Sequence, residues 1–154
     1  MPEHPWLLPG DQLVIDGADF RVAAVMLGRA DRLTFQRVTA TPQLGGEQRI
    51  LLQLEDGLLE ARELAPETLS GEDAQLDGHT FALHWDSTVR TERMAEGKSV
   101  TFGRGQCAWY VADDGSVALR LVERHDSEAL VGAPLAPARI DLRFTEGLRR
   151  GGRD

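Results

Sequence analysis

The stretch from Gly105 to Glu123, GQCAWYVADDGSVALRLVE, constrains the fold of this chain more than any other. Two apolar runs flank Asp114-Gly115. A DG dipeptide in this setting is the strongest short-range signal for a β-hairpin, because both central residues of a type I′ turn need positive φ. If these two residues form the loop, Val111 faces Ala118. We therefore predict a long antiparallel hairpin.

Both faces of this hairpin are apolar, because side chains alternate between the faces of a strand. A hairpin with one solvent-exposed face would show a polar residue at every second position. We therefore predict a central hairpin that the rest of the domain, or a partner, covers on both sides. A one-residue shift in the turn would change which residues pair but would leave both faces apolar. One face carries Cys107, Trp109, Val111, Ala118 and Val122, and the other Ala108, Tyr110, Ala112, Val117, Leu119 and Leu121.

Composition and charge exclude several classes of function. The chain has 154 residues, 42% of them hydrophobic, which is enough for a core. Its net charge is −8 and its pI is about 5.0. A nucleic-acid-binding protein needs a basic surface that replaces counterions, and binding to anionic lipid needs basic residues too. The balance of charge therefore argues against both kinds of partner.

The single cysteine and the N-terminal sequence predict a compartment. Cys107 has no second cysteine for an internal disulfide, which is typical of a reducing environment. The first ten residues, MPEHPWLLPG, lack the basic start and apolar core of a signal peptide. No apolar run approaches the roughly 20 residues that a membrane helix needs. We predict a soluble, cytoplasmic protein without membrane insertion.

The order of strand and turn signals predicts an all-β fold with little helix. Residues 1–9 read as an extended arm, 10–69 as a first β half, 70–145 as a second and 146–154 as a flexible tail. Residues 58–65, LLEARELA, have helical composition but follow a DG turn, so we favour a strand. Whether the halves form one barrel or two packed sheets stays open. The other expected strands are 12–15, 19–27, 33–40, 48–54, 80–85, 88–95, 99–102, 128–131 and 138–144.

The two halves resemble each other in the order of their signals. Asp16-Gly17 precedes an aromatic strand that begins near Phe20, and Asp77-Gly78 precedes one near Phe81, at an offset of 61 positions. We interpret this as a pseudo-repeat of about sixty residues, in which each copy covers the apolar face of the other. Chance is the alternative, since DG turns are common in β proteins.

Four segments carry a resemblance to a known family: LLPGDQLVIDGADFRVAAV, RILLQLEDGLLEARE, LDGHTFAL and CAWYVADDGSVALRLVERHDSEALVGAPLAPARIDL. Together they resemble a bacterial domain of unknown function, the four-one-seven-eight family, from Pro9 to Phe144. The resemblance implies no catalytic residues, because the family has no established activity. Its members lie beside genes linked to membrane stress and polyamine chemistry, which implies a scaffold or sensor role.

The residues that could carry chemistry have simpler structural roles, so we assign no catalytic, cofactor-binding or metal-binding residues. Cys107 lies in an apolar strand, where a cysteine is usually an inert small hydrophobe. His79 and His84 lie five apart on a strand, so they face opposite sides and share no metal unless a bulge intervenes. Gly103-Arg104-Gly105 does not open a helix as a phosphate loop does. We expect no cofactor.

Four residues are candidates for a contact surface or a pocket: His84, Trp85, Arg90 and Trp109. Tryptophan is enriched at protein interfaces, although a buried core accounts for the tryptophans equally simply. Arg90, Arg93 and Arg104 could gather near the central hairpin and bind an anion. Ion pairs with Glu92 and Glu96 account for the same arginines.

Two hypotheses of function follow from the sequence. The favoured one is a non-catalytic β domain that acts as a protein-interaction or scaffold module, by partner binding or self-association, in a stress-related system. The alternative is a small-ligand-binding protein or enzyme with a pocket between the two halves. The acidic charge, the two-faced hairpin and the missing catalytic pattern favour the first hypothesis.

Overall fold

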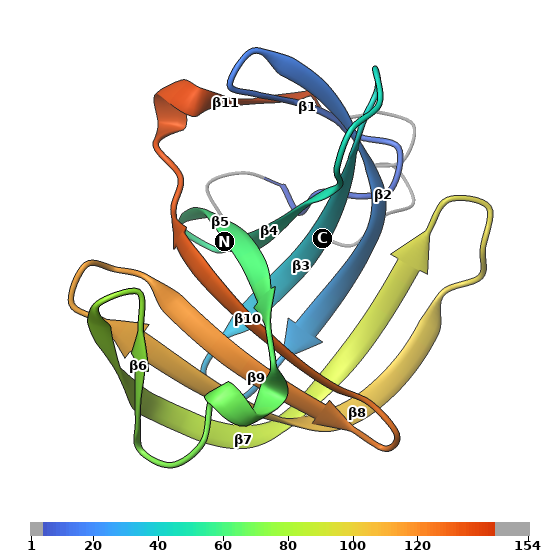
Figure 1. Cartoon of the computed structure of the whole chain (residues 1–154). Helices are drawn as coiled ribbons and strands as arrows, with labels where there is room; N and C mark the ends of the chain where they lie inside the picture. Colours follow the sequence, from blue (N-terminus) through green and yellow to red (C-terminus); the bar gives the residue numbers. More distant parts are fainter. Residues whose placement is uncertain (1–4, 144–154) are drawn as a thin grey trace.

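A computed structural model describes residues 5–143 of the chain (Figure 1). The predicted tail at 146–154, the first four residues of the predicted arm and Phe144 lie outside this range. The described residues form eleven strands and two short 3₁₀ helices. These elements are β1 (Gln12–Ile15), β2 (Ala18–Arg29), β3 (Thr34–Pro42), β4 (Arg49–Leu54), β5 (Gly57–Leu64), η1 (Pro66–Thr68), β6 (Asp73–Leu76), β7 (His79–Ala95), β8 (Thr101–Ala112), β9 (Val117–Glu123), β10 (Ser127–Pro134), η2 (Pro137–Arg139) and β11 (Ile140–Arg143).

Eight strands close into an antiparallel barrel, in the order β2-β3-β4-β5-β10-β9-β8-β7. The barrel closes where β7 pairs with β2, from Ala24 opposite Ala95 to Arg29 opposite Arg90. β1 with β11, and β6, continue the sheet beyond the closure. The prediction of an all-β fold with little helix is confirmed, and the arrangement is one barrel built by both halves. Residues 57–64 form β5, so the preference for a strand there is also confirmed.

The barrel interior and two outer layers form three cores. The interior core includes Phe35, Leu52 and Trp109. A second core lies where β1 and the start of β2 fold over the outer faces of β3 and β4. A third lies where β6 and the start of β7 fold over β8, β9 and β10, and it includes Phe81 and Tyr110. Both faces of the central hairpin are therefore largely buried over residues 107–112 and 116–121, as its composition predicts, whereas Val122 is exposed.

The register of the central hairpin differs from the prediction by one residue. Val111 pairs with Val117, and Trp109 pairs with Leu119. The amide of Gly115 donates to the carbonyl oxygen of Ala112 (3.1 Å), and Gly115 has φ +87°. The loop thus has three residues and ends in a left-handed glycine, a common alternative to the two-residue turn. Consequently Val117, Leu119 and Leu121 share the inner face with Cys107, Trp109 and Val111.

Three predicted strand boundaries are wrong. The segments 80–85 and 88–95 belong to one strand, β7, whose register shifts at a bulge between Leu83 and Trp85. Residues 101–102 continue directly into the hairpin strand β8 instead of forming a separate strand. The last strand starts only at Ile140, because residues 137–139 form η2 with Pro137 at its first turn.

Several features recur at an offset of 61 residues. Asp16 and Asp77 are the non-glycine residues with positive φ within residues 5–143, at +51° and +52°, and each precedes a glycine in a two-residue loop. The register of β2 shifts between Val22 and Ala24, and that of β7 between Leu83 and Trp85, again 61 positions apart. Descent from an internal repeat remains a prediction.

Candidate functional site

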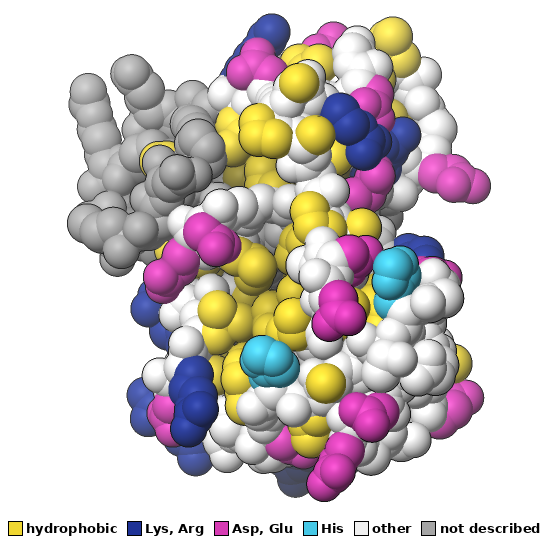
Figure 2. Space-filling view, turned by 90° about the vertical axis from the view of Figure 1, so that its left-hand side faces the viewer, with side chains coloured by type: hydrophobic (Ala, Val, Ile, Leu, Met, Phe, Trp, Pro, Cys, Tyr) yellow, Lys and Arg dark blue, Asp and Glu magenta, His cyan; other side chains and the backbone are white. Residues whose placement is uncertain are grey.

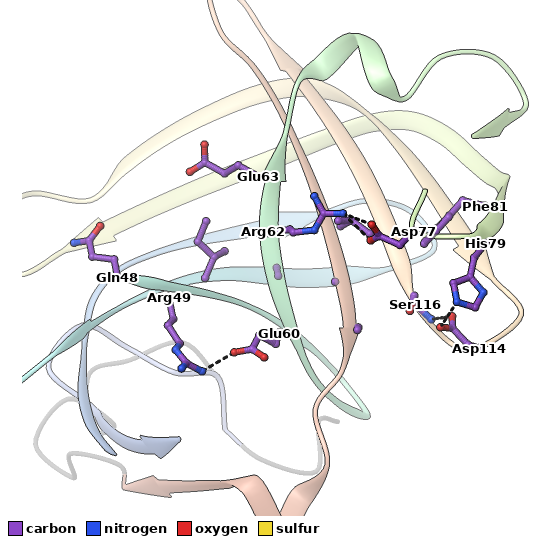
Figure 3. Close-up of a pocket in the computed structure, with 15 residues that line it drawn as sticks. Gln48, Arg49, Glu60, Arg62, Glu63, Asp77, His79, Phe81, Asp114 and Ser116 are labelled. Carbon is purple, nitrogen blue, oxygen red and sulfur yellow. Dashed lines mark hydrogen bonds and ion pairs between the residues drawn. The ribbon is translucent and has the colours of Figure 1, made fainter. Parts of the chain in front are cut away.

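A groove of about 720 Å³ lies on the outside of the barrel, and we call it the outer groove. Its walls come from β4, β5, β10 and the start of β7, and from the β6–β7 and β8–β9 turns (Figure 3). Residues from 48 to 63 line one part and residues from 77 to 133 the other, so both predicted halves contribute.

The lining of the outer groove is partly apolar. Ile50, Ala61, Phe81, Val131 and Ala133 all line it, although Ile50 and Ala61 also pack against the interior core. Phe81 and Val131 are buried in the third core, whereas Ala133 is exposed. Figure 2 shows hydrophobic side chains gathered in a hollow across one face of the molecule, with acidic and histidine side chains at its border. Such a surface can take apolar side chains of a binding partner.

Ion pairs flank the apolar part of the outer groove (Figure 3). Arg49 Nη1 lies 2.7 Å from Glu60 Oε2, and Arg62 Nη2 lies 2.6 Å from Asp77 Oδ2. The second pair joins β5 of the first half to the β6–β7 turn of the second. Four carboxylates, those of Glu60, Glu63, Asp77 and Asp114, line the groove against two guanidinium groups. The lining by itself therefore carries more carboxylates than guanidinium groups, although Glu63 and Glu60 also pair with Arg37 and Arg139 from outside it.

A serine, a histidine and an aspartate meet at one end of the outer groove, but not in a catalytic order. His79 Nε2 lies 3.6 Å from Asp114 Oδ2, and the Ser116 amide donates to Asp114 Oδ1 (2.9 Å). That backbone hydrogen bond, followed by one from the Ser116 side chain, lowers the pKa of Asp114. The aspartate thus lies between the other two residues, whereas nucleophilic catalysis requires the histidine to contact the serine. The contacts of Asp114 with His79 and Ser116 therefore stabilise the β8–β9 turn.

The structure brings together two of the four residues predicted for a contact surface or pocket. Trp85 and Trp109 are opposite one another on β7 and β8, and their rings stack with centroids 5.6 Å apart at an angle of 3°. Phe35 packs against Trp109 with centroids 5.4 Å apart. His84 is exposed beside the bulge of β7, and Arg90 is exposed on the outer face of the barrel.

Cys107 lies inside the barrel and is fully buried. Desolvation by burial, with a smaller contribution from Asp86, raises the pKa of its thiol to about 12. At neutral pH the group is therefore a protonated thiol, whereas nucleophilic chemistry needs the thiolate.

One end of the barrel interior is polar. Arg37 Nε lies 3.1 Å from Glu128 Oε1, and Arg93 pairs with Glu123, which also accepts a hydrogen bond from Thr91 Oγ1 (3.0 Å). The hydrogen bond with Arg93 lowers the pKa of Glu123, and burial raises that of Glu128. Paired charges of this kind stabilise one arrangement of side chains.

The predicted grouping of Arg90, Arg93 and Arg104 holds for Arg90 and Arg104 but is wrong for Arg93, and the predicted ion pairs with Glu92 and Glu96 are not found among the described residues. Arg93 points into the barrel, because it lies on the same face of β7 as the buried Thr91. Its partner is Glu123, and Glu96 pairs instead with Arg21 (2.5 Å). Arg90 and Arg104 remain neighbours on the outer face.

The sequence predicts, as one alternative, a pocket between the two halves, but none of the four candidate residues lines the outer groove. Arg62 and Asp77 lie 15 positions apart on elements that only the folded barrel brings together. The Asp77-Gly78 turn was the one available signal, and it predicted a turn without showing what the turn would face.

Comparisons of the chain with protein-family models, with curated proteins and with solved structures find no match. The resemblance to the four-one-seven-eight family stays a prediction. Over residues 5–143, no group of three or more histidine, cysteine, aspartate or glutamate side chains is arranged to hold a metal ion. The same residues contain no helix of the length and hydrophobicity that a membrane crossing requires.

Proposed function

We propose that this chain is a protein-interaction module and that the outer groove binds an extended segment of its partner. The observation that supports the proposal is the composition of the groove, whose apolar surface lies between ion pairs supplied by both halves. The groove offers no nucleophile–base pair among its lining residues, so it is built to bind rather than to react. A cytoplasmic location and a stress-related role remain part of the proposal.

The charge of the outer groove indicates the chemistry of the partner segment. Four carboxylates against two guanidinium groups favour a segment with basic side chains, because opposite charges across an interface attract. The exposed Ala133 and its apolar neighbours favour a small or medium apolar side chain between them. We therefore expect the bound segment to combine one or two basic residues with an apolar residue.

Selection of a random twelve-residue peptide library on the immobilised protein tests this proposal. We expect the enriched peptides to contain arginine or lysine next to an apolar residue. Ala133→Arg fills the groove and adds a positive charge, and we expect it to weaken binding of a selected peptide at least about tenfold. Ala133→Glu adds comparable bulk with the opposite charge, so we expect a smaller loss.

Thr88→Arg is the matched control, because Thr88 is exposed on β7 and does not line the outer groove. We expect it to bind the peptide as the unaltered chain does. Equal loss of binding in Ala133→Arg and Thr88→Arg would contradict the proposal, and so would enrichment of acidic peptides.

A small ligand is the second candidate, because the outer groove has the volume of many small-molecule sites, about 300–1,000 Å³. A thermal-shift screen with metabolites, including polyamines and nucleotides, tests it. A ligand of the groove should raise the melting temperature of the unaltered chain and not that of Ala133→Arg. A screen in which no compound moves the melting temperature would remove this candidate.

A further inference from the structure

Three arginines lie side by side on the outer face of the barrel, across three strands. Arg29 of β2 is directly opposite Arg90 of β7, and Arg90 is directly opposite Arg104 of β8. All three are exposed. Directly opposite residues have Cα atoms about 5 Å apart, so the three guanidinium groups occupy one small area. We call these residues the arginine row.

No carboxylate forms an ion pair with the arginine row in the described part of the chain, although Glu92 lies two positions from Arg90 on the same face of β7. Arg21, Arg62 and other exposed arginines do form such ion pairs. Like charges directly opposite one another on a sheet are destabilising. This unfavourable cluster occurs on a chain with a net charge of −8. It therefore contributes nothing evident to stability and suits an anionic partner.

Exposed apolar side chains flank the arginine row on the same face of the sheet. Phe102, on β8 two positions before Arg104, is 78% exposed, and Val122 of β9 is 40% exposed. Arginine and aromatic residues dominate the binding energy of protein interfaces. A free phosphate would use the arginines alone, whereas a polypeptide would use the apolar side chains as well.

We propose that the arginine row, with Phe102 and Val122, is a second contact surface that binds an acidic polypeptide segment with apolar residues. It lies apart from the outer groove, since none of these residues lines that groove. The inference is independent of the function proposed for the groove. Nucleic acid is the less favoured partner, because a net charge of −8 repels a phosphate backbone outside this one area.

Fluorescence polarisation with a labelled twelve-residue peptide of alternating glutamate and leucine or phenylalanine tests the proposal. We expect binding that weakens with salt, because exposed charges are screened. Removal of the central charge in Arg90→Gln should weaken it about tenfold. Phe102→Ser should also weaken it. Arg143→Gln removes an exposed arginine on β11 and should leave binding unchanged.

Two further measurements distinguish a peptide-binding surface from a structural role of the arginine row and from a nucleic-acid site. We expect Arg90→Gln to unfold at the same or a higher temperature than the unaltered chain, because the variant relieves repulsion. A clear loss of stability would show a structural role and would overturn the proposal. Equal peptide binding by Arg90→Gln and the unaltered chain would overturn it too, as would tighter binding of a labelled twelve-nucleotide oligothymidylate than of the peptide.

Discussion

At the scale of single residues, one inserted position decides where the predicted site residues point. The bulge of β7 lies at His84, so Trp85 turns inward and stacks on Trp109 while His84 stays exposed. Strict alternation from His79 onward would have placed Trp85 on the outer face of the sheet. A bulge adds one residue to one strand and has no clear sequence signal. For this reason the sequence could suggest these four residues but not their grouping.

The buried thiol of Cys107 leads to a prediction about reactivity. Because its pKa is raised to about 12, the thiolate is scarce at pH 8, and burial hides the sulfur as well. We expect Ellman's reagent to label the native protein far more slowly than the same protein in guanidinium chloride. Labelling of native protein as fast as of unfolded protein would show that Cys107 is accessible.

The two glutamates at the polar end of the barrel lead to opposite predictions about pH. Arg93 lowers the pKa of Glu123, so the stabilisation by this carboxylate is present above the unfolded-state pKa and is lost as pH falls. The free energy of unfolding that Glu123→Gln loses relative to the unaltered chain should therefore shrink as the pH falls from 7 to 3. Burial raises the pKa of Glu128, so its ionisation costs stability as pH rises. The free energy of unfolding of Glu128→Gln should therefore rise relative to that of the unaltered chain between pH 4 and pH 7.

Urea unfolding of both variants across this pH range measures the two trends. Each variant is compared with the unaltered chain at the same pH, which cancels the titration of all other groups. If the free energies of both variants, relative to the unaltered chain, moved in the same direction with pH, the assignment of the two environments would be wrong.

At the scale of elements, turn chemistry predicts most hairpins correctly but gives the register of one hairpin incorrectly. Asp16-Gly17 and Asp77-Gly78 form two-residue loops with positive φ, as the dipeptides predict. Asp114-Gly115 does not, because Asp113 joins the loop and only Gly115 is left-handed. Two consecutive aspartates allow either loop, and the sequence alone cannot choose between them. The resulting shift exchanges the faces of every residue in β9.

Packing between β2 and β3 depends on a glycine. A Cβ at Gly28 would lie 2.5 Å from the ring of Phe35, the residue directly opposite it. Phe35 is fully buried against Trp109 and cannot move aside. We expect Gly28→Ala to lower the free energy of unfolding by about 1–3 kcal/mol.

Gly57→Ala is the control for this prediction. Gly57 also lies in a strand, and a Cβ there would meet nothing within 4 Å. We expect it to change the free energy of unfolding by less than about 1 kcal/mol in the same chemical denaturation experiment. Equal effects of the two substitutions would contradict the packing described for Phe35.

At the scale of the whole molecule, the sequence predicted the fold class and, as an alternative, a pocket between the halves, but not the closure of the barrel or the residues of the outer groove. Alternating strands and turns indicate antiparallel sheet wherever they occur. Closure depends on the pairing of β2 with β7, whose paired residues lie between 61 (Arg29 and Arg90) and 71 (Ala24 and Ala95) positions apart in the chain. The groove depends on Arg62 of β5 meeting Asp77 of the β6–β7 turn. Contacts at such separations leave no local pattern.

The most direct test of the outer groove as a binding surface is amide hydrogen exchange, measured with and without a peptide selected from the library. We expect the peptide to slow exchange in the residues around the groove, on β5, on β10 and at the β6–β7 turn. Residues 27–29, 88–92 and 102–106, around the arginine row, should exchange as before. Slower exchange confined to the residues around the arginine row, or no change at the groove, would contradict the proposal that the groove binds the partner.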